Sequence, residues 1–532
     1  MPTARPNVLI ILADDMGYSD LGCYGGEIGT PNIDGLGARG VRLTNFYNTA
    51  RCSPSRASLL TGLHPHQTGV AELVNNDGPG GYPGSLNGRC VTLAESFRAA
   101  GYHTHLTGKW HLSNEREHPD HTWPTRRGFE RFWGTISGAG SYFQPTTLHD
   151  GETPVPLSEL GPDFYYTDEI GAHAAAAIRD AAGDDRPFFG YVAFTAPHWP
   201  LHAKTSDLVE TRGMFDEGWD VLRTRRWQRQ LDAGICAADA TLDRRDPEVP
   251  AWEDEPEQKW QLERMEAYAA QLRAMDRAVG AILTALDETG QRENTIVLFL
   301  SDNGGCAEEL RSDPEGVERF RQHHLIIPPS APDGTPMKVG NSPDIRPGTA
   351  DTYTSYGIAW ANLSNTPFRL YKRWVHEGGI ATPLIVSWPA GGLAGGVVDA
   401  PHQLTDIAPT LLEATGVPVP VERAGERTTA LPGVSMLDLL RGGDAVEHDL
   451  FWEHIGNAAI RSGRWKLVRE YQGPWELYDL AVDRSETNDL AAEHPALVED
   501  LAGRWQAWAD EVGVIPYGAV LTARAAMPVQ PA

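Results

Sequence analysis

Two pairs of oxygen-bearing side chains each follow a short apolar run in this 532-residue sequence. Asp14-Asp15 follow residues 7–13, and Asp302-Asn303 follow a similar run. Such runs are typical of strands buried on both faces, and the polar residues beyond the carboxyl ends of parallel strands gather at one edge of the sheet. Carboxylate and amide oxygens suit Ca²⁺ or Mg²⁺ rather than zinc. Either pair alone is more often a loop cap, so the predicted metal site depends on both pairs.

A third candidate is the stretch from Cys52 to Gly62, Cys-Ser-Pro-Ser-Arg-Ala-Ser-Leu-Leu-Thr-Gly. It predicts a loop that enters a short helix, with Ser53 as N-cap, Pro54 at the first helical position and Gly62 as the stop. This geometry places the Cys52 side chain at the positive end of a helix dipole, with Arg56 one turn away. Such a site stabilises negative charge on the group that occupies it.

Three further side chains are candidates for handling an anion or a proton. Lys109 and His111 follow a predicted strand that ends at Gly108, and strand alternation places both on the same side. His198 lies in Ala-Pro-His-Trp-Pro at the exit of another apolar run. A lone Lys-x-His is more often a solvent-facing pair, and a lone loop histidine is more often a surface residue. These predictions therefore depend on the rest of the constellation.

The elements that must position these residues alternate between buried strands and helices. This alternation predicts an α/β fold with a large, mostly parallel sheet and helices around it. The strand candidates are residues 7–13, 187–197, 295–300 and 383–388, and the helix candidates are residues 167–182 and 257–289.

The pattern changes beyond about residue 440. Residues 458–470 alternate, a second short strand follows a Gly-Pro turn, and residues 495–512 form an amphipathic helix. We therefore expect a main domain over residues 1–440 and a smaller C-terminal α+β domain with an antiparallel sheet over residues 441–532. Three segments are expected to form the loops that decide the substrate, namely residues 134–156, 205–257 and 307–353.

Charge and cysteine content exclude several classes of protein. A net charge of −27 argues against binding to nucleic acid or to anionic membrane surfaces. No apolar run reaches the length of a membrane span. Five scattered cysteines, without Cys-x-x-Cys spacing, indicate neither a disulfide framework nor a zinc site held by cysteines. No export signal is visible near Met1, so we expect a cytoplasmic protein, with the periplasm as the alternative.

The stretch from Cys52 to Gly62 resembles the signature of the type I, formylglycine-dependent sulfatases, which belong to the alkaline-phosphatase-like superfamily. Residues 101–112 resemble the second signature of that family, and residues 356–372 resemble bacterial arylsulfatases. The resemblance covers nearly the whole chain. It implies an alkaline-phosphatase-like fold and conversion of Cys52 to formylglycine by a formylglycine-generating or related maturation enzyme that reads Pro54 and Arg56.

The resemblance also implies a metal site and an additional lysine. Asp14, Asp15, Asp302 and Asn303 would be the ligands of one divalent cation, with the modified Cys52 near the ion. Calcium is the usual metal of the family, and magnesium is the alternative. Sulfatases carry a lysine five residues before a Glu-Gly-Gly, which here is Lys372, with Arg373 as its rival.

The implied activity is hydrolysis of a small-molecule sulfate ester, of the arylsulfatase type, to an alcohol or phenol and inorganic sulfate. Lys109, His198, Lys372 and the cation would hold the sulfate, while Arg56 and Lys109 would stabilise the formylglycine hydrate. Asp302 would accept a proton as the hydrate attacks sulfur. His198 would then protonate the leaving oxygen, and His111 would take the last hydroxyl proton as sulfate is eliminated.

Three other activities compete with this interpretation. A formylglycine-dependent phosphonate monoester or phosphodiester hydrolase of the same superfamily tends to have histidine where this chain has Asn303. A catalytically silent sulfate-ester binding protein would result if Cys52 stayed unmodified. A polysaccharide sulfatase is disfavoured by the lack of an export signal. The sequence leaves the oligomeric state and the alcohol that carries the sulfate open.

Overall fold

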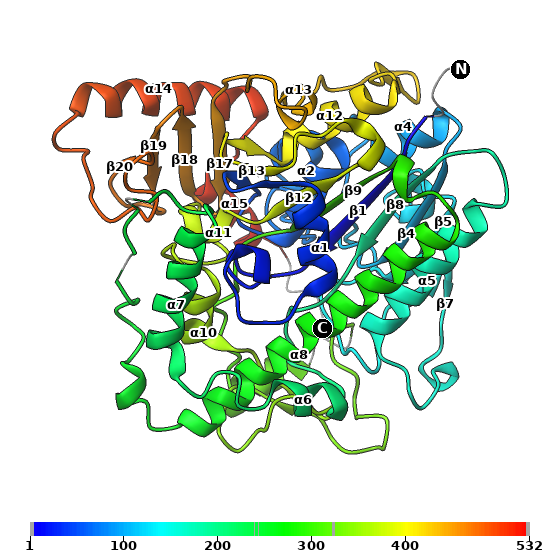
Figure 1. Ribbon diagram of the computed structural model, residues 1–532, viewed down its shortest axis with the longest axis vertical. Coiled ribbons are helices and arrows are strands. Elements are labelled where there is room, and N and C mark those ends of the chain that lie inside the picture. Colours follow the sequence, from blue (N-terminus) through cyan, green and yellow to red (C-terminus); the bar gives the residue numbers. More distant parts are fainter. Residues whose placement is uncertain (1–4, 239, 243, 322–324, 528–532) are drawn as a thin grey trace.

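The centre of the protein is a ten-stranded sheet. The computed structural model describes residues 5–238, 240–242, 244–321 and 325–527 (Figure 1). From one edge to the other, the strands are β13 (Gly396–Val398), β2 (Val41–Leu43), β12 (Leu384–Ser387), β9 (Thr295–Ser301), β1 (Asn7–Ala13), β8 (Phe188–Ala193), β4 (His103–Gly108), β5 (Arg131–Thr135), β6 (Leu148–Asp150) and β7 (Thr153–Pro154).

Helices cover both faces of this sheet. The longer helices of the chain as a whole are α1 (Pro31–Arg39), α2 (Cys52–Thr61), α4 (Leu93–Ala99), α5 (Tyr166–Ala181), α6 (Thr205–Thr211), α7 (Gly218–Asp232), α8 (Gln258–Glu288), α9 (Pro314–Arg321), α10 (Gly357–Ser364), α12 (Ile407–Thr415), α14 (Pro495–Val512) and α15 (Tyr517–Ala525). Single turns form α3 (Pro65–Thr68), α11 (Glu377–Ile380) and α13 (Leu437–Leu440). Short strand pairs are β3 (Phe46–Tyr47) with β14 (His402–Gln403), β10 (Lys338–Val339) with β11 (Thr352–Tyr353), and β15 (Glu422–Arg423) with β16 (Glu426–Arg427).

Strand β1 explains why the sheet needs helices on both sides. Leu9 and Ile11 pack in a core with α5 and α8, whereas Val8 and Ile10 pack in a second core with α2, α4 and α12. Figure 1 shows α5 and α8 lying across one face of the sheet. Each buried Leu or Ile contributes about 1.5–3 kcal/mol, so both faces must stay covered. The predicted strand at residues 7–13, buried on both faces, is confirmed.

The pairing directions confirm the predicted fold class, a large mixed and mostly parallel sheet of the alkaline-phosphatase-like type. Strands β9, β1, β8 and β4 are neighbours and run parallel, so their carboxyl ends meet at one edge. Strand β12, predicted from residues 383–388, pairs antiparallel with both of its neighbours. The segments at 205–257 and 307–363 contain helices α6, α7, α9 and α10 besides irregular chain.

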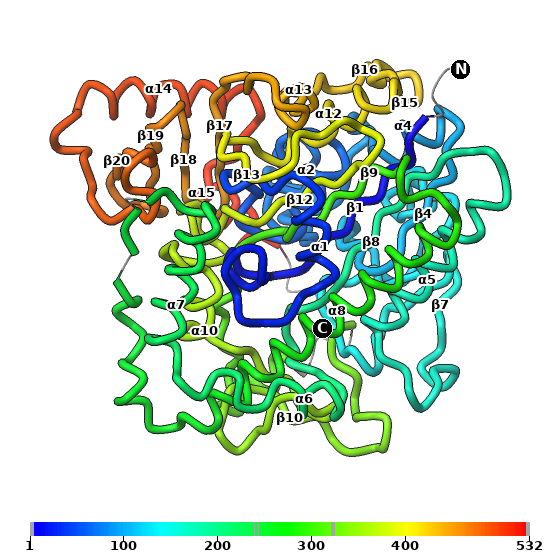
Figure 2. The backbone as a smooth tube through the Cα atoms, viewed as in Figure 1, coloured from blue at the N-terminus to red at the C-terminus, as the bar shows by residue number. Residues whose placement is uncertain are grey.

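The C-terminal part forms a separate four-stranded antiparallel sheet, as predicted. Its strands are β17 (Leu450–His454), β18 (Asn457–Ser462), β19 (Trp465–Arg469) and β20 (Glu476–Asp479). Helix α14 packs on this sheet through Leu501 and Trp505, and Figure 2 shows this orange-to-red region gathered at one side of the molecule. The domain boundary at residue 440 stays a prediction. Within the described ranges, no helix is both long and apolar enough to cross a membrane.

A buried ion cluster joins the C-terminal sheet to helix α11. Lys466 Nζ, from β19, lies 2.9 Å from Glu377 Oε1 and 2.8 Å from Glu486 Oε1, and all three side chains are fully buried. Arg484 and Tyr47 contact the other oxygen of Glu377 at 3.1 Å and 2.9 Å. Glu377 opens helix α11, which directly follows the loop that carries Lys372.

We expect Glu377→Gln to lower the free energy of unfolding by about 3–5 kcal/mol, because it leaves Lys466 and Arg484 buried against a neutral side chain. The matched control is Glu288→Gln, which breaks an exposed ion pair with Arg179 and should cost less than about 1 kcal/mol. Midpoints of urea-induced unfolding, followed by tryptophan fluorescence, compare the two variants. Equal midpoints would contradict the role given to the buried cluster.

Candidate active site

Three carboxylates face three cations at the carboxyl edge of the central sheet. Every one of these side chains is buried, with at most 2% of it exposed. The contacts are Lys109 Nζ to Asp14 Oδ2 (2.6 Å), Lys372 Nζ to Asp15 Oδ2 (2.7 Å) and Arg56 Nη2 to Asp302 Oδ2 (2.7 Å). Six charges packed together away from water are stable only because each has a partner in contact.

The shifts in pKa follow from this crowding. Burial, together with the nearby Asp14, raises the pKa of Asp302 to about 7 in spite of Arg56. Burial also acts to raise the pKa of Asp15, but Lys372 and His198 outweigh it and hold that pKa below its usual range. Asp302 is therefore the better proton acceptor of the two carboxylates.

The predicted metal ligands lie close together, and two of their oxygens accept no hydrogen bond from the described residues. Asp14 Oδ1 and Asn303 Oδ1 are buried and have no hydrogen-bond partner among the described residues. The Asn303 amide nitrogen donates to Asp15 Oδ1 at 2.7 Å and to the Gly304 carbonyl at 2.8 Å, which fixes the orientation of the amide. Asp14 and Asp15 also form, with His198, a group of donor atoms within 4.8 Å of one another. These oxygens fit a hard divalent cation such as Ca²⁺ or Mg²⁺.

Cys52 is the first residue of helix α2 and is only 3% exposed. The predicted cap at Ser53 is wrong: Arg51 occupies the N-cap position, Pro54 is the third helical residue, and the Ser53 hydroxyl is buried with no hydrogen-bond partner. The helix starts earlier because Cys52 itself already has helical backbone. Gly62 ends the helix in a left-handed conformation, as predicted.

The thiol of Cys52 is poorly suited to act as a nucleophile. Burial raises its pKa, and nearby Lys109 and Lys372 do not compensate for it. A buried neutral thiol is chemically inert compared with a thiolate. Its sulfur lies 3.5 Å from His111 Nδ1, which places this histidine directly beside residue 52.

His111 is held in an unusual backbone conformation. Its φ of 56° lies in the left-handed region, which costs a non-glycine residue about 1–2 kcal/mol. A Cβ atom on Gly138 would lie 2.1 Å from His111 Cε1, so only glycine leaves room for the ring. Burial, reinforced by Lys109 and Arg56, holds the pKa of His111 well below its usual range, so the ring is neutral.

His198 presents one ring nitrogen to the cluster. Its Nδ1 donates to the Trp199 carbonyl at 2.6 Å, so Nε2 faces Lys372 Nζ at 3.4 Å and Asp15 Oδ2 at 3.3 Å. Burial lowers the pKa of His198 to about 4, with Lys372 acting in the same direction and Asp15 against it. An anion bound at Nε2 would raise this pKa.

Lys372, and not its neighbour Arg373, belongs to the cluster. Leu370 and Arg373 both have left-handed backbone, with φ of 62° and 93°. This conformation turns the side chains of Lys372 and Arg373 in different directions. Lys372 is 4% exposed and contacts Asp15, whereas Arg373 is exposed and its guanidinium lies over the Trp374 ring at 5.7 Å.

Comparison with known proteins identifies the family. Residues 6–417 match the family described as Sulfatase, and residues 368–506 match the C-terminal region described for N-sulphoglucosamine sulphohydrolase. The chain belongs to the sulfatase family. Its members hydrolyse sulfate esters and typically use a metal ion and formylglycine, which agrees with the metal-binding group at Asp14, Asp15 and His198.

Similarity to individual sulfatases extends over most of the chain. An uncharacterized sulfatase of Schizosaccharomyces pombe is 32% identical over 96% of this chain and 94% of its own. An arylsulfatase of Klebsiella aerogenes is also 32% identical, over 81% of this chain and 91% of its own. The solved structure of Ps i-CgsB with k-i-k-neocarrahexaose has a TM-score of 0.68 and 24% identity, and covers 99% of this chain and 98% of that one. The last comparison shows a shared fold.

The sequence interpretation missed a polar group beside the sulfatase site, formed by Arg51, Trp199 and Glu308. Arg51 Nη1 lies 3.1 Å from Glu308 Oε1, and the indole of Trp199 donates to Glu308 Oε2 at 3.1 Å. Burial raises the pKa of Glu308, but Lys372 and Arg51 outweigh it and lower the pKa to about 2. Arg51 directly precedes Cys52 and Trp199 directly follows His198, but no sequence pattern indicates that a third residue joins them.

All the predicted site residues of this sulfatase converge at the sheet edge. They are Asp14, Asp15, Cys52, Arg56, Lys109, His111, His198, Asp302, Asn303 and Lys372. Arg56 contacts Asp302 and the Lys109 carbonyl. The catalytic role of each residue stays a prediction.

We expect Gly138→Ala to reduce kcat about a hundredfold, because the added methyl group displaces the His111 ring from residue 52. Gly161→Ala is the control, since a Cβ at Gly161 meets nothing within 4 Å. Sulfate release from 4-nitrophenyl sulfate measures the effect, and thermal unfolding checks that both variants fold. Full activity of a folded Gly138→Ala protein would contradict the positioning of His111.

Proposed function

We propose that this sulfatase is of the arylsulfatase type and hydrolyses the sulfate monoester of a small alcohol or phenol after Cys52 has been converted to formylglycine. One observation carries the proposal. Residue 52 lies at the start of helix α2, in contact with His111 and inside a buried cluster of three cations and three carboxylates. A buried thiol with a raised pKa is poorly suited to act as a nucleophile there, whereas an aldehyde hydrate offers two hydroxyl groups.

The cations would hold the sulfate group. Lys109 contacts Asp14 and Lys372 contacts Asp15 within the cluster, and the N-terminus of α2 adds a partial positive charge. Placing fixed positive charges where a sulfate oxygen gains charge lowers the barrier to S–O cleavage. The three cations and three carboxylates balance one another, so the bound divalent cation would supply the net positive charge that lets a chain with a net charge of −27 bind an anion.

Asp14, Asp15, Asp302 and Asn303 would hold the divalent cation, for which we favour Ca²⁺ over Mg²⁺. When bound, it would supply Lewis-acid stabilisation of negative charge on the sulfate and on residue 52. Asp14 Oδ1 and Asn303 Oδ1, which accept no hydrogen bond among the described residues, support this assignment, although Arg56 Nη2 lies 3.6 Å from the Asp14 oxygen.

Three residues are positioned to move protons. Asp302, whose carboxylate lies in the buried cluster 2.7 Å from Arg56 Nη2, would accept a proton from the attacking hydroxyl of residue 52. His198 presents Nε2 to the cluster and would donate a proton to the leaving oxygen after the anionic substrate has raised its pKa. His111, neutral and beside residue 52, would take the proton of the second hydroxyl, which releases sulfate.

The arylsulfatase type is supported by similarity to the Klebsiella aerogenes arylsulfatase over most of both chains. Asn303 in the metal group argues against a phosphonate monoester or phosphodiester hydrolase of the superfamily, since those enzymes tend to have histidine at this position. A maturation enzyme acting on Cys52 and a cytoplasmic location belong to the same proposal.

Mass spectrometry of the tryptic fragment 52–56 should show the cysteine sulfur replaced by an aldehyde oxygen. The same sample should release nitrophenol from 4-nitrophenyl sulfate, lose this activity after treatment with a chelator, and recover it with Ca²⁺. If the fragment retains its thiol, co-expression with a formylglycine-generating enzyme should restore activity. A fully modified protein that cleaves a matched phosphonate ester much faster than the sulfate would contradict the proposal.

The adjacent basic residues provide a paired test of sulfate binding. We expect Lys372→Ala to lower kcat/KM for 4-nitrophenyl sulfate by about 10²–10³-fold, because it removes one buried cation from the anion site. Arg373→Ala should stay within about threefold of the parent, since that side chain is exposed. Equal losses in the two variants would show that Lys372 has no special role.

A further inference from the structure

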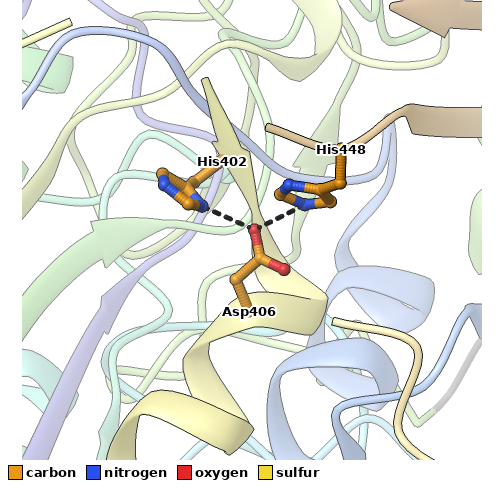
Figure 3. A group of neighbouring side chains, drawn as sticks. All are labelled: His402, Asp406 and His448. Carbon is orange, nitrogen blue, oxygen red and sulfur yellow. Dashed lines mark hydrogen bonds and ion pairs between the residues drawn. The ribbon is translucent and has the colours of Figure 1, made fainter. Parts of the chain in front are cut away.

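A second group of titratable side chains lies outside the cluster at the sheet edge. It joins three parts of the chain: His402 on β14, Asp406 at the start of α12, and His448 shortly before β17 (Figure 3). Figure 3 shows both imidazole rings turned toward the Asp406 carboxylate. None of these residues has a role in the sulfatase chemistry proposed above.

The donor atoms have the spacing of a metal site. His402 Nδ1 lies 2.9 Å from Asp406 Oδ2, His448 Nε2 lies 3.2 Å from the same oxygen, and the three atoms are within 4.8 Å of one another. Zinc bonds of about 2.0–2.2 Å in tetrahedral geometry place ligand atoms about 3.3 Å apart.

Neighbouring backbone groups already orient the carboxylate and one ring. The Val434 amide donates to Asp406 Oδ1 at 2.9 Å, and the Gln403 amide donates to Asp406 Oδ2 at 3.1 Å. The Val446 carbonyl accepts from His448 Nδ1 at 3.1 Å, which places the ring hydrogen on Nδ1. Nε2 of the neutral ring then has a free lone pair, the form in which histidine binds metals.

A positive charge is needed beside the Asp406 carboxylate, and either a protonated histidine or a bound cation would supply it. Asp406 is fully buried, and its ion pairs within the described ranges are both to histidines. His448 Nε2 has no hydrogen-bond partner there, so a neutral ring would direct a lone pair at a carboxylate oxygen. A bound cation would satisfy both groups together.

We propose that His402, Asp406 and His448 form a structural zinc site. Two imidazoles and one carboxylate match the ligands that zinc prefers, whereas Ca²⁺ and Mg²⁺ prefer oxygen alone. His448 borders a cavity of about 570 Å³ that Val446 and Asp399 also line, and this cavity supplies a route for the ion and a water molecule for the fourth position. The ion would tie the segment that leads into the C-terminal sheet to helix α12 of the main domain.

Cobalt binding tests the site directly, because four-coordinate Co²⁺ absorbs visible light where zinc does not. We expect the chelator-treated protein, in excess Ca²⁺, to bind one Co²⁺ with this absorption and to lose it when Zn²⁺ is added. A hundredfold excess of Zn²⁺ over its Kd should raise Tm by about 2–5 °C. His121→Gln is the matched control, since His121 is an exposed histidine beside Asp120 and should leave all three results unchanged.

His448→Gln should lose both the cobalt absorption and the rise in Tm while it retains sulfatase activity. His448→Cys, at a side chain that is 17% exposed, provides a second test, because a thiolate ligand adds a sulfur-to-cobalt charge-transfer band in the near ultraviolet. A proton shared between Asp406 and the two histidines would produce no cobalt absorption. A parent protein without this absorption, a His448→Gln protein that retains it, or a His448→Cys protein without the new band would overturn the proposal.

Discussion

The site depends on one electrostatic constraint, the burial of three carboxylates and three cations in mutual contact. Removing charged groups from water costs several kcal/mol each, and direct pairing recovers this cost only when the geometry is good. The cations come from separate places: Arg56 from helix α2, Lys109 from the end of β4, and Lys372 from the loop before α11. An error in the placement of any one of these elements would leave a buried charge without a partner, so the cluster constrains the fold as much as the fold constrains the cluster.

The sheet topology meets this constraint with little irregular structure. Because β9, β1, β8 and β4 are parallel neighbours, the residues after their carboxyl ends meet without long connections. The left-handed backbone of Asp15 and His111, with φ of 64° and 56°, turns these side chains back toward the cluster. The ion cluster around Glu377 then supports the Lys372 loop from the C-terminal sheet, so a distant part of the chain contributes to the same site.

Much of this arrangement could be predicted from the sequence, because apolar runs and the polar residues that follow them are local patterns. The strands at 7–13 and 295–300, the helix at 495–512 and the residues of the site all follow from such patterns or from the family signatures. The antiparallel direction of β12 and the contact between Arg51 and Glu308 could not be predicted, since both depend on packing between distant segments. The error at Ser53 has a local cause: serine is a favourable N-cap residue, but Ser53 is the second residue of helix α2, and the N-cap is Arg51.

The burial of Cys52 also sets an order of events during synthesis. In the folded chain this residue is 3% exposed, and its sulfur lies 3.5 Å from His111 Nδ1. An enzyme that converts Cys52, as proposed above, must therefore reach it before the chain has folded around it. Lys466, which forms an ion pair with Glu377, is synthesised more than 400 residues after Cys52. Translation therefore provides an interval in which Cys52 can be modified. A protein that folds before it meets that enzyme would keep its thiol permanently.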